Sequence, residues 1–171
     1  LKNVGVKRIV MLTGDSKKVA ESVAGNLVID EYFSELLPQE KVLKVEGLLA
    51  SKNKDENLAF VGDGINDAPA LTIADTGMAI GAGTDVAIDA ADVVLMKSSL
   101  LDVSAAIRLS RLTLKNIREN LFWAFFYNLC MIPIACGILQ PLGITMNPMI
   151  AAFAMTISSL TVVLNALRLR I

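Results

Sequence analysis

Two carboxylates stand four residues apart in the stretch FVGDGINDAPAL, which occupies residues 60–71 and begins in a short apolar run. Asp63 and Asp67 would repel each other at the end of a strand, and both stay ionised comfortably only beside a cation. Mg²⁺ answers that need, because it prefers oxygen ligands and is commonly held by one or two carboxylates, waters and phosphate oxygens. Gly62 and Gly64 fit positions where the backbone turns tightly and approaches a phosphate without an intervening Cβ. The stretch therefore predicts a magnesium and phosphate site.

Three further residues could supply the other groups that a phosphate needs. Thr13 and Gly14 belong to a TGD that follows another apolar run, and they offer a hydroxyl and a backbone N–H. Lys41 lies three residues past Pro38, near the start of a helical pattern, and could place an ammonium against phosphate oxygens. A lone GDG is usually a turn and a lone TGD means little. Together, however, these groups are the electrostatic parts of a phosphoryl-transfer site.

The elements that must hold these residues are short apolar runs that alternate with helical patterns. We expect strands at residues 8–12, 58–61, 77–81 and 92–96, and helices at residues 17–27 and 38–51. Such alternation is typical of crossover units, in which strands apolar on both faces lie in a parallel sheet covered by helices. The pattern predicts a Rossmann-like α/β fold. Ligands in such sheets bind at the carboxyl ends of the strands, which is where TGD and GDGIND fall.

The second half of the chain has the composition of a membrane segment, with no charged residue between Glu119 and Arg168. Residues 121–139 and 148–167 each approach the roughly 20 apolar residues that cross a hydrocarbon core of about 30 Å, and residues 140–147 join them. Basic residues lie outside both ends: Arg108, Arg111, Lys115, Arg118, Arg168 and Arg170. By the positive-inside rule both ends are cytoplasmic and the joining loop is extracytosolic.

This division predicts a cytosolic α/β portion over residues 1–98 and an amphipathic connector helix over residues 99–120, followed by a transmembrane hairpin. The alternative, that both apolar runs are buried helices of a large soluble protein, stays open. Acids and bases nearly cancel, at 17 against 16, so no basic face argues for nucleic-acid binding. The chain begins at Leu1 and enters a strand-like run almost at once, from which we expect the C-terminal piece of a longer protein.

Four motifs run through the first half in a fixed order: TGD, LLPQEK, VGDGINDAPAL and GMAIGAGTDVAIDAADVVLM. With these motifs and the two apolar runs, the whole chain resembles the C-terminal part of a P-type ATPase, and more narrowly of the heavy-metal-transporting branch. The resemblance implies a haloacid-dehalogenase-like phosphorylation domain. It also implies that Asp63 helps to hold Mg²⁺, that Asn66 and Asp67 order the site, and that Lys41 stabilises the transferring phosphoryl group.

Under the same resemblance, Thr13 and Asp15 line this pocket, and ATP is bound mainly by a nucleotide-binding domain that the sequence lacks. The aspartate that accepts the phosphoryl group in this family lies in a DKTGT motif, which does not occur here. The TGE loop and the Cys-Pro-Cys motif of the family are also absent. Without the nucleophile this segment alone should be inactive, and enzymatic function belongs to a longer chain.

Polar residues inside the apolar runs could form an ion path, because burying them there is costly without a function. The first run carries Tyr127 and Asn128, and the second carries Met155, Ser158 and Ser159 at spacings that share one helical face. A thioether is a soft ligand that favours Cu⁺ over Zn²⁺. YN and MxxSS also resemble the signature of copper(I)-exporting ATPases. The alternatives are a tyrosine anchor at the membrane interface, a methionine that fills a packing gap and serines that let helices approach.

The leading hypothesis is a C-terminal segment of a copper(I)-transporting P-type ATPase of the cell membrane. Its expected partners are the rest of the same pump chain, the lipid bilayer and a copper chaperone. Alternatives are a zinc- or cadmium-pump fragment, a membrane-tethered haloacid-dehalogenase-like phosphatase, and a split pump half that binds a partner through its sheet edge. Cys130 and Cys136 suit neither a redox pair nor a zinc knuckle and are expected to be small buried hydrophobes.

Overall fold

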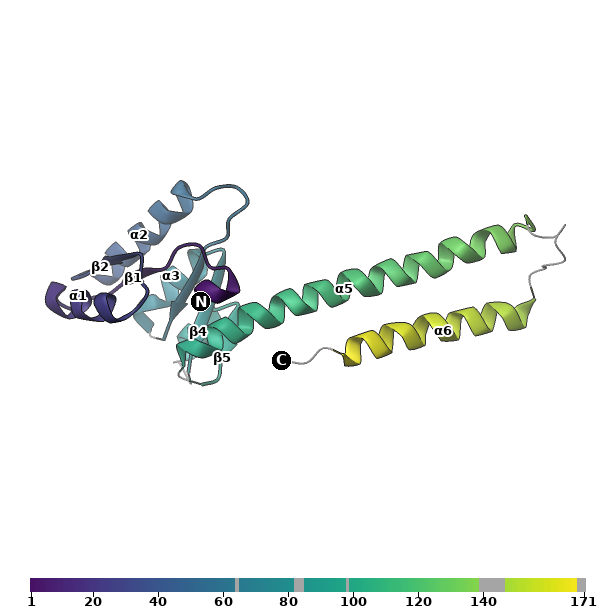
Figure 1. Cartoon of the computed structure of the whole chain (residues 1–171). Helices are drawn as coiled ribbons and strands as arrows, with labels where there is room; N and C mark the ends of the chain where they lie inside the picture. Colours follow the sequence, from purple (N-terminus) through teal and green to yellow (C-terminus); the bar gives the residue numbers. More distant parts are fainter. Residues whose placement is uncertain (64, 82–84, 98, 139–146, 169–171) are drawn as a thin grey trace. The chain divides into compact units, whose positions relative to one another are not determined.

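The chain forms two compact units, Leu1–Ser104 and Ala105–Ile171, and Figure 1 shows the chain with most of its helices and strands labelled. The structure, a computed structural model, describes residues 1–63, 65–81, 85–97, 99–138 and 147–168. Gly64, the last residue of the first predicted span and most of the predicted extracytosolic loop lie outside these ranges.

The N-terminal unit alternates strands and helices, as predicted. Its elements are η1 (Lys2–Val4), β1 (Val10–Leu12), α1 (Lys17–Asn26), β2 (Glu31–Phe33), α2 (Pro38–Ser51), β3 (Ala59–Gly62), η2 (Ile65–Asp67), α3 (Ala68–Ile73), β4 (Thr76–Ile80), α4 (Asp85–Ala90) and β5 (Val93–Leu95). All four predicted strands and both predicted helices are present. The sequence did not predict β2, α3 and α4, which have only three to six residues each.

The strands pair in parallel, as expected, but the prediction of one sheet is wrong for the described residues. β1 pairs with β2 in one sheet, and β3, β4 and β5 form a second sheet in that order. β3 and β4 are aligned so that Gly62 lies opposite Ala79. A pattern of apolar runs shows which segments are strands, but it carries no information on which strands are neighbours. The TGD and GDGIND loops therefore follow strands of different sheets.

Helix α3 anchors the second site loop by packing directly on β4. A Cβ built at Gly77 would lie only 2.4 Å from the Leu71 carbonyl oxygen, so glycine is required for this close approach. Leu71 is itself fully buried, as is Val45 of α2, and α2 and α3 contact each other. Met78 and Ala79 of β4 complete the centre of this core. The contacts of α3 with β4 and with α2 therefore hold the loop between β3 and α3 in place.

Two long helices make up the second unit, α5 (Leu100–Ala135) and α6 (Pro148–Leu167). The predicted connector and the start of the first predicted span form one continuous helix, and the first residues of α5 belong to the N-terminal unit. Gly137, with φ of 73°, follows the end of α5. The side chain of Asn147 caps α6 by accepting a hydrogen bond from the Met149 N–H at 3.0 Å.

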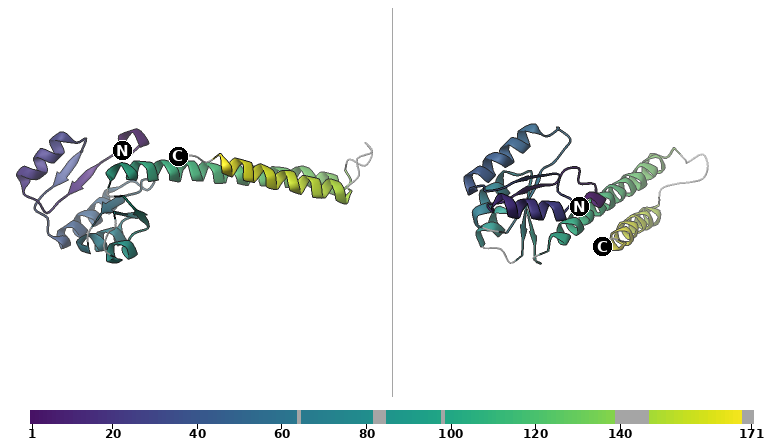
Figure 2. Two further views of the ribbon diagram at one scale, coloured as in Figure 1. Left: turned by 90° about the horizontal axis from the view of Figure 1, so that it is seen from below. Right: turned by 60° about the vertical axis from the view of Figure 1, so that its left-hand side comes forward.

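Helices α5 and α6 lie side by side in both views of Figure 2, and hydrogen bonds join them. The Asn116 amide donates to the Asn165 carbonyl oxygen at 2.8 Å, and the Asn165 amide donates to Asn120 Oδ1 at 2.9 Å. Over the ranges that the structure describes, none of the helices has both the length and the apolar character needed to span a bilayer.

Candidate functional site

The TGD loop is closed by its own side chains. The Thr13 hydroxyl donates to Asp15 Oδ2 at 2.8 Å, and the Asp15 N–H donates back to Thr13 Oγ1 at 3.1 Å. This local turn holds the backbone at the end of β1 in one shape. A Cβ at Gly14 would come within 3.3 Å of the Leu36 carbonyl oxygen, so the loop also lies close to the segment before α2. Thr13, Gly14 and Asp15 therefore form one structural group.

The segment from Phe33 to Leu37 ties the TGD loop to helix α2, a link that the sequence did not predict. The Thr13 N–H donates to the Phe33 carbonyl at 3.0 Å, the Leu36 N–H donates to the Thr13 carbonyl at 3.1 Å, and the Glu35 N–H donates to the Asp15 carbonyl at 2.9 Å. Glu35 adopts a φ of 58°, a left-handed conformation that costs a residue with a Cβ about 1 kcal/mol. The sequence around Glu35 contains no signal that predicts a left-handed conformation at this position.

Helix α2 begins immediately after this segment and carries Lys41. Pro38 occupies the first turn, and the Glu40 carboxylate accepts a hydrogen bond from the Leu37 N–H at 2.8 Å. These two features fix the start of the helix. The backbone contacts of the Phe33–Leu37 segment thus set the position of Lys41 relative to TGD.

An ion pair between Lys41 and Asp67 joins α2 to the loop after β3. Lys41 Nζ lies 2.9 Å from Asp67 Oδ1, and the two side chains keep only 18% and 13% of their exposure. The two predicted site residues are 26 positions apart in the chain and meet in the fold. A charge pair so shielded from water is costly to break, because each partner would leave the other buried and uncompensated.

Gly62 makes room for Asp67. A Cβ at this position would lie 2.9 Å from Asp67 Cβ and 3.0 Å from Asp67 Oδ2. The sequence-based explanation for Gly62 was a close approach to a phosphate. The structure gives a more direct reason. The Asp67 side chain lies beside the end of β3, where a Cβ at position 62 would collide with it.

Asp63 and Asn66 precede Asp67 in the same loop and are exposed, and Gly64 lies outside the described residues. Within the described part of the chain, three or more acidic, histidine or cysteine side chains nowhere gather into a metal cage. Mg²⁺ does not require one, since two carboxylates with waters and phosphate oxygens suffice. The exposed Asp63 and the buried Asp67 match that donor set, although Asp67 also pairs with Lys41.

Three other carboxylates of the N-terminal unit have lowered pKa values and serve its structure. The Lys2 ammonium and the Ile9 N–H lower the pKa of Asp30, and Lys7 and the Asn53 N–H lower that of Glu56. The Leu58 N–H, followed by Lys52, lowers the pKa of Asp75. Each carboxylate bonds a backbone N–H next to a strand or turn, so each ties chain segments together rather than facing the candidate site.

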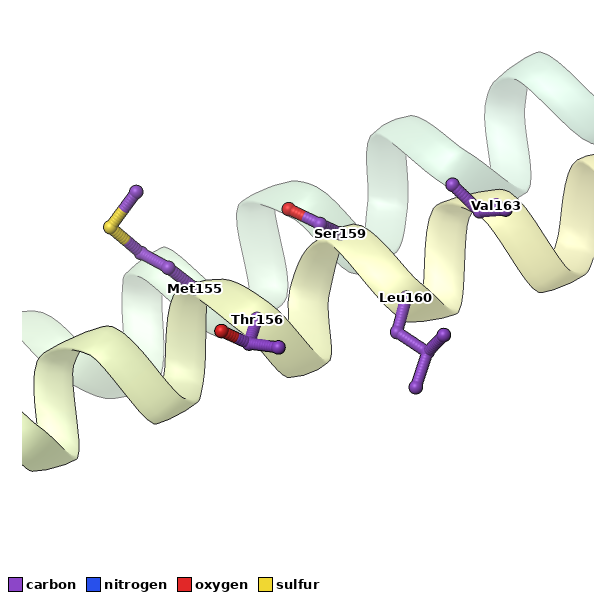
Figure 3. A pocket seen from close by; sticks show the side chains of 5 residues that line it. All are labelled: Met155, Thr156, Ser159, Leu160 and Val163. Atoms are coloured by element: carbon purple, nitrogen blue, oxygen red, sulfur yellow. The ribbon is translucent and has the colours of Figure 1, made fainter.

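The predicted ion ligands of α6 lie along an open groove. Met155 and Ser159, with Thr156, Leu160 and Val163, line a shallow cavity of about 460 Å³, which Figure 3 shows from close by. Met155 is 73% exposed and Ser159 is also exposed, whereas Ser158 is half-buried. Two of the three predicted residues of α6 therefore share one solvent-facing groove.

The predicted ion ligands of α5 are not gathered at that groove. The Tyr127 hydroxyl lies 3.3 Å from Thr161 Oγ1, while the exposed Asn128 donates to the Ala124 carbonyl of its own helix at 2.9 Å. Thr161 and Ser159 are two residues apart, about 200° around the helix, and so point to opposite faces. The described residues therefore do not bring the predicted ligands of the two helices together.

Cys130 and Cys136 are free and exposed, so the expectation that they are buried is wrong for this chain. Two helices side by side have too little surface to cover residues on their outer faces. Nothing in their surroundings assigns them a chemical role.

Comparison with known proteins agrees with the chemistry of the site. Residues 1–75 match the family described as haloacid dehalogenase-like hydrolase. Copper-transporting ATPase 1 of Rhizobium meliloti is 52% identical, over 99% of this chain and 20% of that protein. Human copper-transporting ATPase 2 is 50% identical, over 99% of this chain and 11% of that protein. The chain thus spans a fifth or less of these relatives' lengths.

A solved structure gives the same result for the fold. The crystal structure of a zinc-transporting PIB-type ATPase in its E2·Pi state matches with a TM-score of 0.78 and 38% identity, over 98% of this chain and 26% of that protein. The similarity in sequence and in structure runs through the site loops and both helices of the second unit. The chain therefore belongs to the P-type ATPases, and the members that it matches are named as copper- or zinc-transporting.

Proposed function

We propose that this chain is the C-terminal segment of an ATP-driven copper(I) pump, in which it supplies part of the phosphoryl-transfer site and part of the ion path. The observation that carries the proposal is the 49–52% identity, over nearly the whole chain, to proteins named as copper-transporting ATPases. The ion pair of Lys41 and Asp67 provides charged groups of the kind that a phosphoryl-transfer site uses.

In the proposed phosphoryl-transfer site, Asp63 and Asp67 would hold Mg²⁺, which when bound neutralises charge on the phosphate oxygens. Lys41 faces Asp67 and is held at the start of a fixed helix, so its ammonium is available to phosphate oxygens without a large movement. The Thr13 hydroxyl and the loop N–H groups would orient the phosphate. Asn66 and Asp15 would keep the two loops in order.

The nucleophile and the ATP-binding domain would come from the rest of the pump chain. Among the described strands, β1 pairs only with β2 and β3 pairs only with β4, so both have an uncovered edge. A parallel strand between these edges would end beside both TGD and GDGIND and could deliver a carboxylate there. This arrangement supports a segment that depends on a longer chain for activity.

In the membrane, we propose that residues 121–139 and 148–167 form a hairpin with residues 140–147 outside and both ends cytoplasmic. The absence of charge between Glu119 and Arg168, the basic residues on both sides and the relatedness to transport ATPases support this topology. Residues 99–120 would then connect residues 1–98 to the membrane.

Copper is the proposed cargo, with Tyr127, Asn128, Met155, Ser158 and Ser159 as candidate ligands. The soft thioether of Met155 and the identity to copper-transporting ATPases favour Cu⁺. Zinc is the second candidate, because a zinc-transporting ATPase shares the fold at 38% identity. The exposed groove supports a site that further helices of the pump complete.

The test uses the full-length pump with Met155→Leu, which keeps the volume and removes the sulfur. We expect this variant to lose copper-stimulated ATP hydrolysis. Met149→Leu is the matched control, because Met149 lies on the same helix with a similar exposure of 77% against 73%. Copper stimulation that survives Met155→Leu would refute the assigned ligand. Stimulation of the wild type by Zn²⁺ alone would favour a zinc pump, and phosphate-ester hydrolysis indifferent to both ions would favour a phosphatase.

A further inference from the structure

The hydrogen bond between Tyr127 and Thr161 has a direction that the surrounding contacts determine. Thr161 Oγ1 lies 2.8 Å from the Ile157 carbonyl oxygen of its own helix and 3.3 Å from the Tyr127 hydroxyl oxygen. A threonine hydroxyl has one proton, and a carbonyl oxygen can only accept. Thr161 therefore donates to Ile157, and Tyr127 must donate to Thr161.

This direction decides what the tyrosine oxygen can do. Its proton points to Thr161, so the rotation of the hydroxyl group is fixed. The phenol oxygen remains an acceptor, and its lone pairs point away from Thr161. A neutral oxygen held in this way can face a cation or a polar group without first having to reorient its proton.

The register of the two helices is fixed by neighbouring amides. The Asn120 amide donates to Asn116 Oδ1 at 2.9 Å, and both asparagines bond to Asn165 across the helix interface. Asn165 is one turn beyond Thr161 on the same face of α6. A shift of either helix by one residue would break these bonds, so the amides keep Thr161 opposite Tyr127.

We propose that Thr161 is a positioning residue that holds the Tyr127 hydroxyl as a donor to itself and so leaves the phenol oxygen as an acceptor for the transported ion. The inference rests on the proposed function, because it takes Tyr127 as part of the ion path. Thr161 itself does not face the groove of Met155 and Ser159, and its own oxygen is occupied by two hydrogen bonds. It acts through the tyrosine rather than on the ion.

The first measurement follows the donor state of Tyr127 in the full-length pump without copper. The difference in ultraviolet resonance Raman signal between wild type and Tyr127→Phe isolates this tyrosine, and its ring doublet reports whether the hydroxyl donates. We expect Thr161→Val to weaken the donor signature and Thr161→Ser to restore it. Thr156→Val is the control for the spectrum, because Thr156 makes the same bond to its own helix, to Ala152 O at 2.9 Å, with no tyrosine partner recorded.

The second measurement separates copper affinity from turnover. Loss of one neutral hydrogen bond should raise the copper concentration for half-maximal ATP hydrolysis roughly two- to tenfold, with turnover at saturating copper near that of wild type. Tyr127→Phe should have a similar effect, and combining it with Thr161→Val should add little. Thr161→Ser should return the value to that of wild type.

The outcomes distinguish the inference from the function on which it rests. An unchanged tyrosine signature in Thr161→Val, an unchanged copper requirement, or effects that add in the double variant would overturn the positioning role alone. A wild-type pump that copper does not stimulate would overturn the proposed function and the ion role of Tyr127 with it. If Thr161→Val does not fold, the serine variant and Tyr127→Phe decide the question by the same readouts.

Discussion

The two units of this chain connect distant segments with different chemistry. In the N-terminal unit the links are charged, as between Lys41 and Asp67, Lys2 and Asp30, and Lys52 and Asp75. In the helical hairpin the links are neutral amides and hydroxyls. A charge pair tolerates partial burial next to water, whereas the cost of moving charges into an apolar surrounding favours neutral groups. The neutral links between α5 and α6 are therefore those that the proposed membrane hairpin would favour.

The largest effect should come from breaking the shielded charge pair. Lys41→Met leaves the Asp67 carboxylate without its partner, so we expect a loss of about 3 kcal/mol of unfolding free energy in the N-terminal unit. In the full-length pump, ATP hydrolysis should be lost as well. Urea unfolding followed by circular dichroism measures the first effect. Adding Asp67→Leu should restore much of the stability but none of the activity, and a single variant as stable as wild type would contradict the role of the pair.

Glycine replacements should then separate close packing from simple helix preference. Gly77→Ala forces a Cβ to within 2.4 Å of the Leu71 carbonyl oxygen, a backbone atom, and should cost about 2 kcal/mol. Gly47→Ala has no atom within 4 Å of the new Cβ and lies inside α2, so it should stabilise by up to about 1 kcal/mol. Thermal unfolding of both variants checks the opposite signs. Equal effects would contradict the close contact between α3 and β4.

Removal of a neutral link in the hairpin should have a smaller effect. Asn165→Leu takes away the amide that bonds to Asn120 and should cost about 1 kcal/mol, with little dependence on salt. Asn128→Leu is the matched stability control, because the Asn128 amide donates to the Ala124 carbonyl of its own helix and, among the described residues, does not link the two helices. Denaturation of the pump in mixed micelles at two salt concentrations compares the variants. A strong salt dependence would show that the hairpin is not held by neutral groups.

The smallest effect is that of acid, and it should appear in the N-terminal unit and not in the uncharged part of the two long helices. The folded pKa values of Asp30 and Asp75 lie below their ordinary value of 3.8, and that of Glu56 lies below 4.5. Their stabilisation is therefore present above these ordinary values and is lost as the pH falls through the lowered ones. Residues 120–167 contain no charged side chain and should not respond. Unfolding midpoints between pH 6 and pH 3 test this difference, and Asp75→Asn should flatten the response.

The sequence predicted best those elements whose signals are local. Helix α2 occupies the predicted residues 38–51, because Pro38 starts it and its apolar pattern persists. Helix α6 likewise occupies the predicted residues 148–167. Strand β2 has three residues, one of them charged, and α3 and α4 have six each, so none gives a periodic signal. The division into two sheets could not be predicted, since it depends on which strands are neighbours.

For the candidate site, the sequence identified the chemical groups but not their contacts. Lys41 and Asp67 were both predicted, yet their pairing depends on how α2 packs beside the loop after β3. The link through Glu35 depends on a left-handed backbone conformation that no residue type announces there. The position of Gly62 was predicted, but the reason for it emerged only from the Asp67 side chain beside it. Motifs specify residue types, whereas packing decides which groups meet.

In the chain as a separate polypeptide, the edges of β1 and β3 are open to other molecules. A strand edge with unpaired N–H and C=O groups can pair with the edge of another molecule, which leads to aggregation. Among the described strands, β2 and β5 are edge strands as well, so edges on both sheets would allow growth from chain to chain. Three residues in β1 and four in β3 keep each pairing weak. We therefore expect the isolated segment to self-associate with rising concentration, and peptides that cover these edges to reduce the association.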